Sequence, residues 1–338
     1  MSRLAVSVLV LAACADVGPF RSTDGESIDA GLSDVDAATT MSDGPAAAVP
    51  VKLATSTKSP SQIVLTSANV YFTELDSQGI VIFPRNGDTP RIGDAGGVPL
   101  VLAAGGSTIY WIADHTVKSY SESASQPVTR LTSPTLVNAI GVSATDAFTI
   151  DAGPPPNGPG SISRLANAGG AATTVLDGLT SPRAVAASGS TLVWAAGSAV
   201  KRAPLASLGS AQTIGTNQTT VFQIVFDGTR ACWTNATEFE IYDVWCAGPG
   251  AAQRIATAQV QVYGFALTST HLYYTHRPTA TANQYVIESY ELATGTKRTL
   301  RAVSDRYPSS LAADDDALYW IESYPSSSTG EIWRLSLR

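Results

Sequence analysis

The chain has 338 residues and a net charge of −7, with 44% hydrophobic and 14% charged residues. Abundant Gly, Ser, Thr and Ala are typical of turn-rich β structure, and no apolar run is long enough for a membrane-spanning helix. Most of the negative charge lies in the first 50 residues, so residues 51–338 are nearly neutral and have no basic stripe. This charge distribution excludes nucleic acid as an electrostatic partner.

Residues 1–13 have the features of an export signal peptide. Arg3 precedes LAVSVLVLAA, an apolar run that is too short to span a bilayer. The run ends in LAAC at Cys14, which resembles the lipobox of bacterial lipoproteins. That resemblance implies cleavage before Cys14, lipidation of its thiol, and a protein anchored to the cell-envelope membrane that faces the periplasm or the exterior. An ordinary secretion signal that is cut elsewhere is the alternative.

After the lipidated Cys14, the rest of residues 14–50 is predicted to be a flexible acidic tether. Seven acidic residues and a single base, Arg21, follow Cys14 in a segment that is rich in Asp, Ser, Ala and Gly. Such a segment buries too little apolar surface to offset its ordering entropy. As a flexible coil, it would hold the folded body roughly 30–35 Å from the anchor.

From residue 51 onward, an aromatic strand recurs at intervals of 38–46 residues, which is the period of propeller blades. The equivalent positions are Tyr71, Tyr110, Phe148, Val193, Cys232, Tyr273 and Tyr319. Each lies within a group of four short strands that are separated by Gly, Ser, Asn and Asp turns. The sequence therefore predicts an all-β fold over 51–338: a seven-bladed β-propeller of four-stranded antiparallel blades. Six or eight blades are the alternatives.

The last repeat stops at Arg338, after its third strand. In the earlier repeats, the fourth strand ends 17 to 19 residues before the next aromatic position. The same distance before Tyr71 falls at Leu53. We therefore predict that the N-terminal strand Val51–Ala54 supplies the missing outer strand and closes the ring, which removes an open edge.

Several motifs carry a resemblance to known propellers. IYWIAD (109–114), LYYTH (272–276) and LYWIE (318–322) look like the aromatic strand of YWTD-type (LDL-receptor-like) and NHL-type propellers. The stretches 181–196 and 308–322 are similar to the repeats of secreted bacterial propeller lipoproteins. The resemblance implies the fold but no reaction, because propellers serve as receptors, lyases, hydrolases and scaffolds.

Cys232 and Cys246 are predicted to lie on adjacent strands of one hairpin. Export to an oxidising compartment favours a structural disulfide between them, with two buried free thiols as the alternative. The three histidines, His115, His271 and His276, form no cluster with metal-ligand spacing and are expected to be solvated loop residues. No metal or other cofactor is predicted.

Two further features have structural interpretations. The run Asp314–Asp316 fits a tight turn better than a calcium site. The tryptophans all lie on repeat strands, where packing between blades is favoured over a sugar-stacking platform. They are Trp111, Trp194, Trp233, Trp245, Trp320 and Trp333.

The longest and most variable connections should share one face of the propeller, which is where such scaffolds place binding residues. The candidate binding residues on this face are Glu238, Phe239, Tyr242, His276, Arg277, Arg306, Tyr307, Glu322 and Tyr324. We expect a monomeric, non-catalytic binding or scaffold module for a protein or a glycan. Two other functions stay open: a passive structural lipoprotein, and a lyase or lactone hydrolase with a divalent metal at the channel mouth. The residues available for such a metal are Asp114, His115, Asp151, His276 and Glu322.

Overall fold

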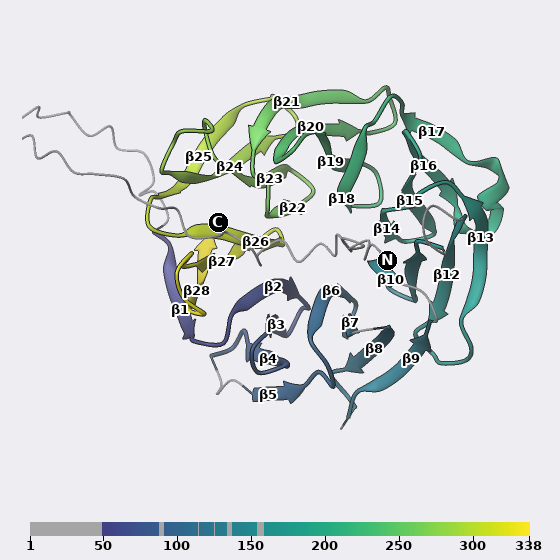
Figure 1. The fold of residues 1–338 in the computed structure, drawn as a ribbon, viewed down its shortest axis with the longest axis horizontal. Coiled ribbons are helices and arrows are strands. Elements are labelled where there is room, and N and C mark those ends of the chain that lie inside the picture. The colour runs from purple at the N-terminus through teal and green to yellow at the C-terminus, as the bar shows by residue number, and fades with distance from the viewer. Residues whose placement is uncertain (1–48, 88–90, 114, 125, 134–136, 154–158) are drawn as a thin grey trace, which may run out of the picture.

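The computed structural model describes residues 49–87, 91–113, 115–124, 126–133, 137–153 and 159–338. The predicted signal peptide, the lipidation site at Cys14 and nearly all of the tether lie outside these residues. Seven four-stranded antiparallel sheets are arranged around one axis (Figure 1), which confirms the predicted seven-bladed β-propeller. In this part of the chain, no helix is long and apolar enough to cross a membrane.

The blades are numbered from the first complete sheet, and their strands follow one another from the axis outward. Blade 1 contains β2 (Pro60–Leu65), β3 (Asn69–Glu74), β4 (Gly79–Pro84) and β5 (Arg91–Asp94). Blade 2 contains β6 (Pro99–Gly105), β7 (Thr108–Ala113), β8 (Thr116–Ser121) and β9 (Val128–Thr132). Blade 3 contains β10 (Val137–Val142), β11 (Asp146–Asp151), β12 (Gly160–Ala166) and β13 (Thr173–Leu179). Blade 4 contains β14 (Ala184–Ser188), β15 (Thr191–Ala196), β16 (Ala199–Pro204) and β17 (Gln212–Gly215).

The short 3-10 helix η1 (Leu205–Ser210) joins the last two strands of blade 4. Blade 5 contains β18 (Thr220–Phe226), β19 (Ala231–Glu238), β20 (Ile241–Ala247) and β21 (Gln253–Val260). Blade 6 contains β22 (Phe265–Leu267), β23 (His271–His276), β24 (Tyr285–Glu291) and β25 (Lys297–Val303). Blade 7 contains β26 (Tyr307–Ala313), β27 (Ala317–Ser323), β28 (Gly330–Ser336) and β1 (Val51–Ser56).

The ring closes as predicted, with the N-terminal strand β1 as the outer strand of blade 7. It pairs antiparallel with β28, from Val51 opposite Arg334 to Ser56 opposite Gly330, so it runs two residues beyond the predicted Val51–Ala54. Figure 1 shows this purple strand beside the yellow C-terminal strand. The two ends of the folded chain therefore share one sheet, and β28 is paired on both of its edges.

The repeated aromatic pair fills the interfaces between blades. In β7, Tyr110 packs into the core cluster shared with blade 3, while Trp111 packs into the cluster shared with blade 1. In β27, Tyr319 likewise faces blade 1 and Trp320 faces blade 6. Because successive side chains of a strand point to opposite sides, two adjacent large residues stabilise both interfaces of their blade.

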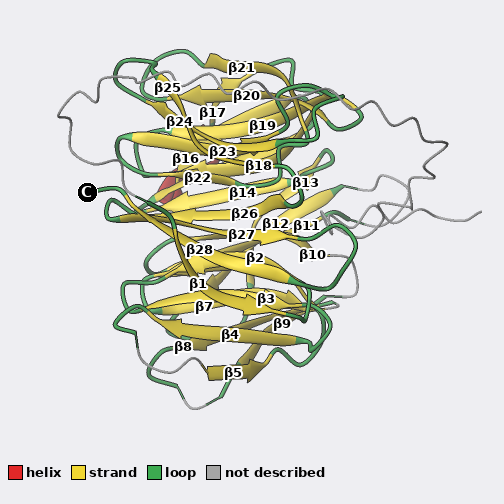
Figure 2. Ribbon diagram, turned by 90° about the vertical axis from the view of Figure 1, so that its left-hand side faces the viewer, coloured by secondary structure: helices red, strands yellow, loops and turns green. Residues whose placement is uncertain are grey.

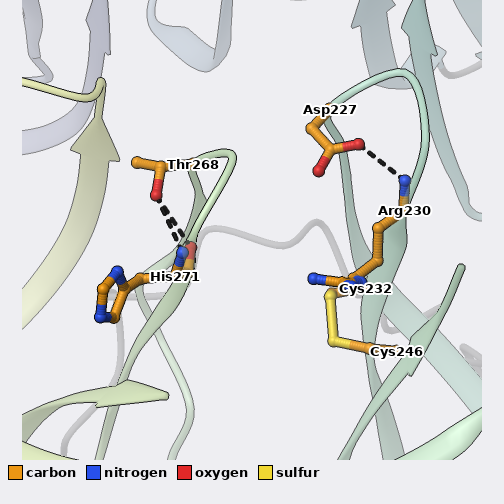
Figure 3. The surroundings of a disulfide bond; sticks show 6 residues. All are labelled: Asp227, Arg230, Cys232, Cys246, Thr268 and His271. Carbon is orange, nitrogen blue, oxygen red and sulfur yellow. Dashed lines mark hydrogen bonds between the residues drawn. A yellow bond between two sulfur atoms is a disulfide. The ribbon is translucent and has the colours of Figure 1, made fainter. Parts of the chain in front are cut away.

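The predicted disulfide joins Cys232 on β19 to Cys246 on β20 (Figure 3). The two residues lie directly opposite each other in the ladder, with a Cα–Cα distance of 4.1 Å. Both sulfur-bearing side chains are buried in the cluster between blades 5 and 6. In Figure 3 the bond lies near the turns that carry Arg230 and His271.

Candidate functional site

The propeller has two unlike faces, which are seen edge-on in Figure 2. The loop face carries the connections from second to third strands and from each blade to the next. The opposite turn face carries the remaining connections and the C-terminus. One of the connections that was expected to be long is a tight hairpin: β19 and β20 are joined by Phe239 and Glu240 alone.

Left-handed backbone conformations at residues other than glycine distinguish the loop face from the turn face. Among the described residues, seven that are not glycine have positive φ: Ser59, Gln78, Ser181, Asn217, Glu240, Ala258 and Gln261. Six lie in loop-face connections, and Ala258 lies near the loop-face end of β21. Such conformations cost of order 1–3 kcal/mol each and are retained where the surroundings impose them, often at functional sites. This observation favours the loop face as the working face.

Aromatic side chains on the loop face gather over blades 5, 6 and 7. We call this group the aromatic sector; it consists of Phe222, Phe239, Tyr242, Tyr263, Tyr285, Tyr307 and Tyr324. The described loop-face connections of blades 1 to 4 contain no Phe, Tyr or Trp. The asymmetry is not required by the fold, since all seven blades have the same strand order.

Three tyrosines at the centre of the sector pack on one another. The ring centroid of Tyr263 lies 6.3 Å from that of Tyr285 and 5.7 Å from that of Tyr307. Tyr285 and Tyr307 are 5.9 Å apart, so each ring contacts the other two. They come from the connection before β22 and from the first residues of β24 and β26, and all three are half-buried.

A hydrogen-bond network ties these tyrosines to blade 5. Gln261 accepts from the Tyr285 hydroxyl at 2.7 Å and from Arg277 Nη1 at 3.3 Å. Its own amide donates to Glu240 at 2.8 Å. Arg277 also lies over the Tyr285 ring and donates to the carbonyl of Ala282. The network holds the positive-φ residues Glu240 and Gln261 in place.

Phe239 is the exposed tip of the sector. Its side chain is 88% exposed, at the end of the β19–β20 hairpin and next to the exposed Glu238. The neighbouring Tyr242 is held against the ring of Phe222 with centroids 5.8 Å apart. Burial and the nearby Glu240 carboxylate raise the pKa of Tyr242, so its hydroxyl stays protonated at neutral pH.

His276 and Glu322, both predicted for the binding face, have buried side chains instead. His276 was expected to be a solvated loop residue, but it is 7% exposed at the end of β23, with Nε2 2.9 Å from Glu288. Its ring stacks on Tyr274 at 5.4 Å. Burial, followed by the Glu288 charge, raises the pKa of Tyr274 well above its usual value.

Glu322 is fully buried within an ionic network on blade 7. Arg301 binds both of its carboxylate oxygens, at 2.9 and 3.3 Å, and Arg306 Nε lies 3.3 Å away. Arg306 also donates to Glu331 at 2.5 Å, and Lys52 on β1 contacts Glu331 at 3.1 Å. The network therefore links the closing strand to the inter-blade connection, which is a structural role.

Tyr263, Tyr285, Arg301 and Glu331 belong to these groups but were missed by the sequence reasoning. Tyr285, Arg301 and Glu331 lie on third and outer strands, where the repeat pattern is weakest. The signal that could have revealed Tyr263 is its position between one repeat and the next, on the same face as Tyr307.

A central cavity of about 460 Å³ runs between the seven innermost strands. Bulges near the loop face shift the register of several of these strands. The freed backbone N–H groups bond to second-strand threonines, Gln62 to Thr73 at 3.0 Å and Gln223 to Thr234 at 3.3 Å. Both glutamines line the cavity.

The residues proposed for a metal do not converge in the described part of the chain. No group of three His, Cys, Asp or Glu residues suited to a metal ion is found there. Asp151 accepts from Ser133 and from the backbone of Gly153, and Asp114 lies outside the described residues.

No family model matches this sequence, and no curated protein matches it. Solved structures share the fold. Streptogramin B lyase aligns at a TM-score of 0.63 and 12% identity, over 86% of this chain and 97% of that one. Kuenenia stuttgartiensis hydrazine synthase aligns at 0.60 and 16%, over 83% and 96%.

PorZ, a bacterial surface component of the type-IX secretion system of Porphyromonas gingivalis, aligns at a TM-score of 0.60 and 12% identity, over 86% of this chain. The chain spans only 38% of PorZ. At identities this low, the structural similarity shows the β-propeller fold alone, and these propellers include enzymes and a surface component.

Proposed function

We propose that this protein is an exported, lipid-anchored binding module whose aromatic sector docks a protein partner at the cell envelope. The lipobox at Cys14 supports the anchor, and the acidic tether would let the propeller reach its partner. The observation that carries the proposal is the one-sided placement of the sector, with exposed Phe239 at its tip. Tyr, Phe and Arg are enriched in protein interfaces, with Tyr and Arg prominent among their energetic hot spots.

The geometry favours a protein over a glycan. A sugar ring stacks on an open, flat aromatic face, but Tyr263, Tyr285 and Tyr307 cover one another's rings. Phe239 is instead a protruding side chain that a pocket on a partner could enclose. The lyase or hydrolase alternative has less support, because Glu322 is already neutralised by Arg301 and Arg306.

The test is chemical crosslinking on intact cells followed by mass spectrometry. Glu238→Ala combined with Phe239→Ala should abolish capture of the partner, because loss of an interface hot spot costs at least about 2 kcal/mol. The matched control is Val128→Ala, which removes an exposed apolar side chain on the outer strand β9. Equal capture of the partner by both variants would refute the aromatic sector as the binding surface. No capture by the wild type would refute protein recognition.

Anchoring is tested separately with Cys14→Ser. The variant should move from the membrane fraction to the soluble fraction, because it can no longer be acylated. A variant that stays in membranes would show that Cys14 is not the anchor.

A further inference from the structure

The central cavity changes character from one end to the other. Its turn-face half is lined by apolar side chains, including Leu65, Val142, Ala187, Phe226, Leu267 and Ala313. Its loop-face end is lined by Gln62, Asn138, Arg183, Gln223, Tyr263 and Ser310. The gradient follows from four of the innermost strands, β2, β10, β18 and β26, in which a polar residue near the loop-face end is followed by apolar residues toward the turn face.

Arg183 is the one charged residue in this lining. It lies just before β14, its side chain is exposed, and its guanidinium has no hydrogen bond or ion pair with any described residue. Other loop-face arginines are occupied: Arg277 by carbonyl groups, and Arg301 and Arg306 by Glu322. Arg183 is thus a cation without a described counter-charge at the mouth of the cavity, whose turn-face half carries apolar side chains, and no carboxylate of the described lining competes for it.

The chemistry of the two ends defines one class of ligand. A volume of about 460 Å³ is within the range of small-molecule sites, and the apolar side chains of the turn-face half favour hydrocarbon in that half. A guanidinium binds carboxylates with two parallel hydrogen bonds. We propose that the channel binds a single-chain carboxylate, with its hydrocarbon tail in the turn-face half and its headgroup on Arg183.

The headgroup position at Arg183 is separate from Phe239, the exposed tip of the surface assigned to the partner, while Tyr263 belongs to both the cavity lining and the aromatic sector. Phe239 and the exposed hairpin lie on blade 5, whereas Arg183 precedes the innermost strand of blade 4. Loss of carboxylate binding would therefore leave partner capture unchanged, so the two proposals fail independently.

The test is isothermal titration calorimetry of dodecanoate, below its micellar concentration, into the full chain carrying Cys14→Ser. We expect saturable binding at one site, with affinity rising about fourfold for each methylene between octanoate and dodecanoate. Arg183→Gln should weaken dodecanoate about tenfold, since charged hydrogen bonds are lost. Arg298→Gln is the matched control, because Arg298 is exposed on the outer strand β25.

Uncharged dodecanol separates the two halves of the proposal. It should bind the wild type and Arg183→Gln with equal affinity, because it uses the apolar half alone. Thermal melting confirms that Arg183→Gln is folded. The proposal is overturned if dodecanoate shows no saturable binding, if chain length has no effect, or if Arg183→Gln and Arg298→Gln bind dodecanoate equally.

Discussion

Removing β1 should destabilise the whole propeller, because that strand completes blade 7. Five register pairs join it to β28, and Leu53 and Ala54 pack on the cluster between blades 7 and 1. Ser56 donates a buried hydrogen bond to Glu74 at 2.6 Å. Partial burial of Leu53, the Glu74 contact and the ladder together contribute about 5 kcal/mol. This is a large fraction of the stability of a typical domain.

The assay compares a chain that begins at residue 49 with one that begins at residue 57, by thermal and urea denaturation. The shorter chain should melt on the order of 10 °C lower. A peptide of residues 49–59, added in excess, should restore part of the loss, because it binds only the folded ring. Melting within about 2 °C of the longer chain would refute the closure argument. Among the described strands, only β1 pairs with the outer edge of β28, so its removal should leave that edge unpaired.

Three further perturbations test the interior. Glu322→Ala leaves Arg301 without its carboxylate partner and Arg306 with Glu331 and Asp305 only. It should cost about 3 kcal/mol in urea denaturation, whereas a loss below 1 kcal/mol would make the network marginal. Replacing Cys232 and Cys246 by Ser should cost about 3 kcal/mol, and reductant should lower the melting temperature of the wild type but not of this variant. For Asp314, burial opposes ionisation, but backbone N–H groups and Arg85 hold the pKa below its usual value. The ionised Asp314 carboxylate therefore makes its full contribution to the free energy of unfolding above about pH 4, and this contribution is lost as the pH falls further. The wild type and Asp314→Asn should thus converge in stability in acid.

The architecture was predictable because each blade repeats one physical solution. The adjacent large residues of Tyr110-Trp111 and Tyr319-Trp320 pack toward opposite neighbours, and the aligned strand recurs seven times at regular spacing, which indicates a closed ring of blades. The missing fourth strand of the last repeat then pointed to the residues before β2. The disulfide followed from register, since Cys232 and Cys246 fall opposite each other once the hairpin is drawn.

The site was less predictable, because loop composition does not show which side chains are covered. Phe239 directly follows one aromatic strand and His276 is the last residue of another, yet Phe239 is 88% exposed and His276 only 7%. The difference is set by strand length: β19 extends to Glu238 and carries Phe239 beyond the body, while β23 ends at His276 inside it.

Polar residues three positions after the repeated aromatic share one physical constraint. Glu74, His276 and Glu322 occupy this position in blades 1, 6 and 7, and each is buried. A buried polar group must bring partners or it is strongly destabilising. Glu74 is satisfied by Ser56 and Ser77, His276 by Glu288, and Glu322 by two arginines from an outer strand and an inter-blade connection. The buried polar groups at these strand ends thus stabilise the ring. Exposed Phe239 and Arg183, whose guanidinium pairs with no described residue, are instead available to a partner or ligand outside the fold.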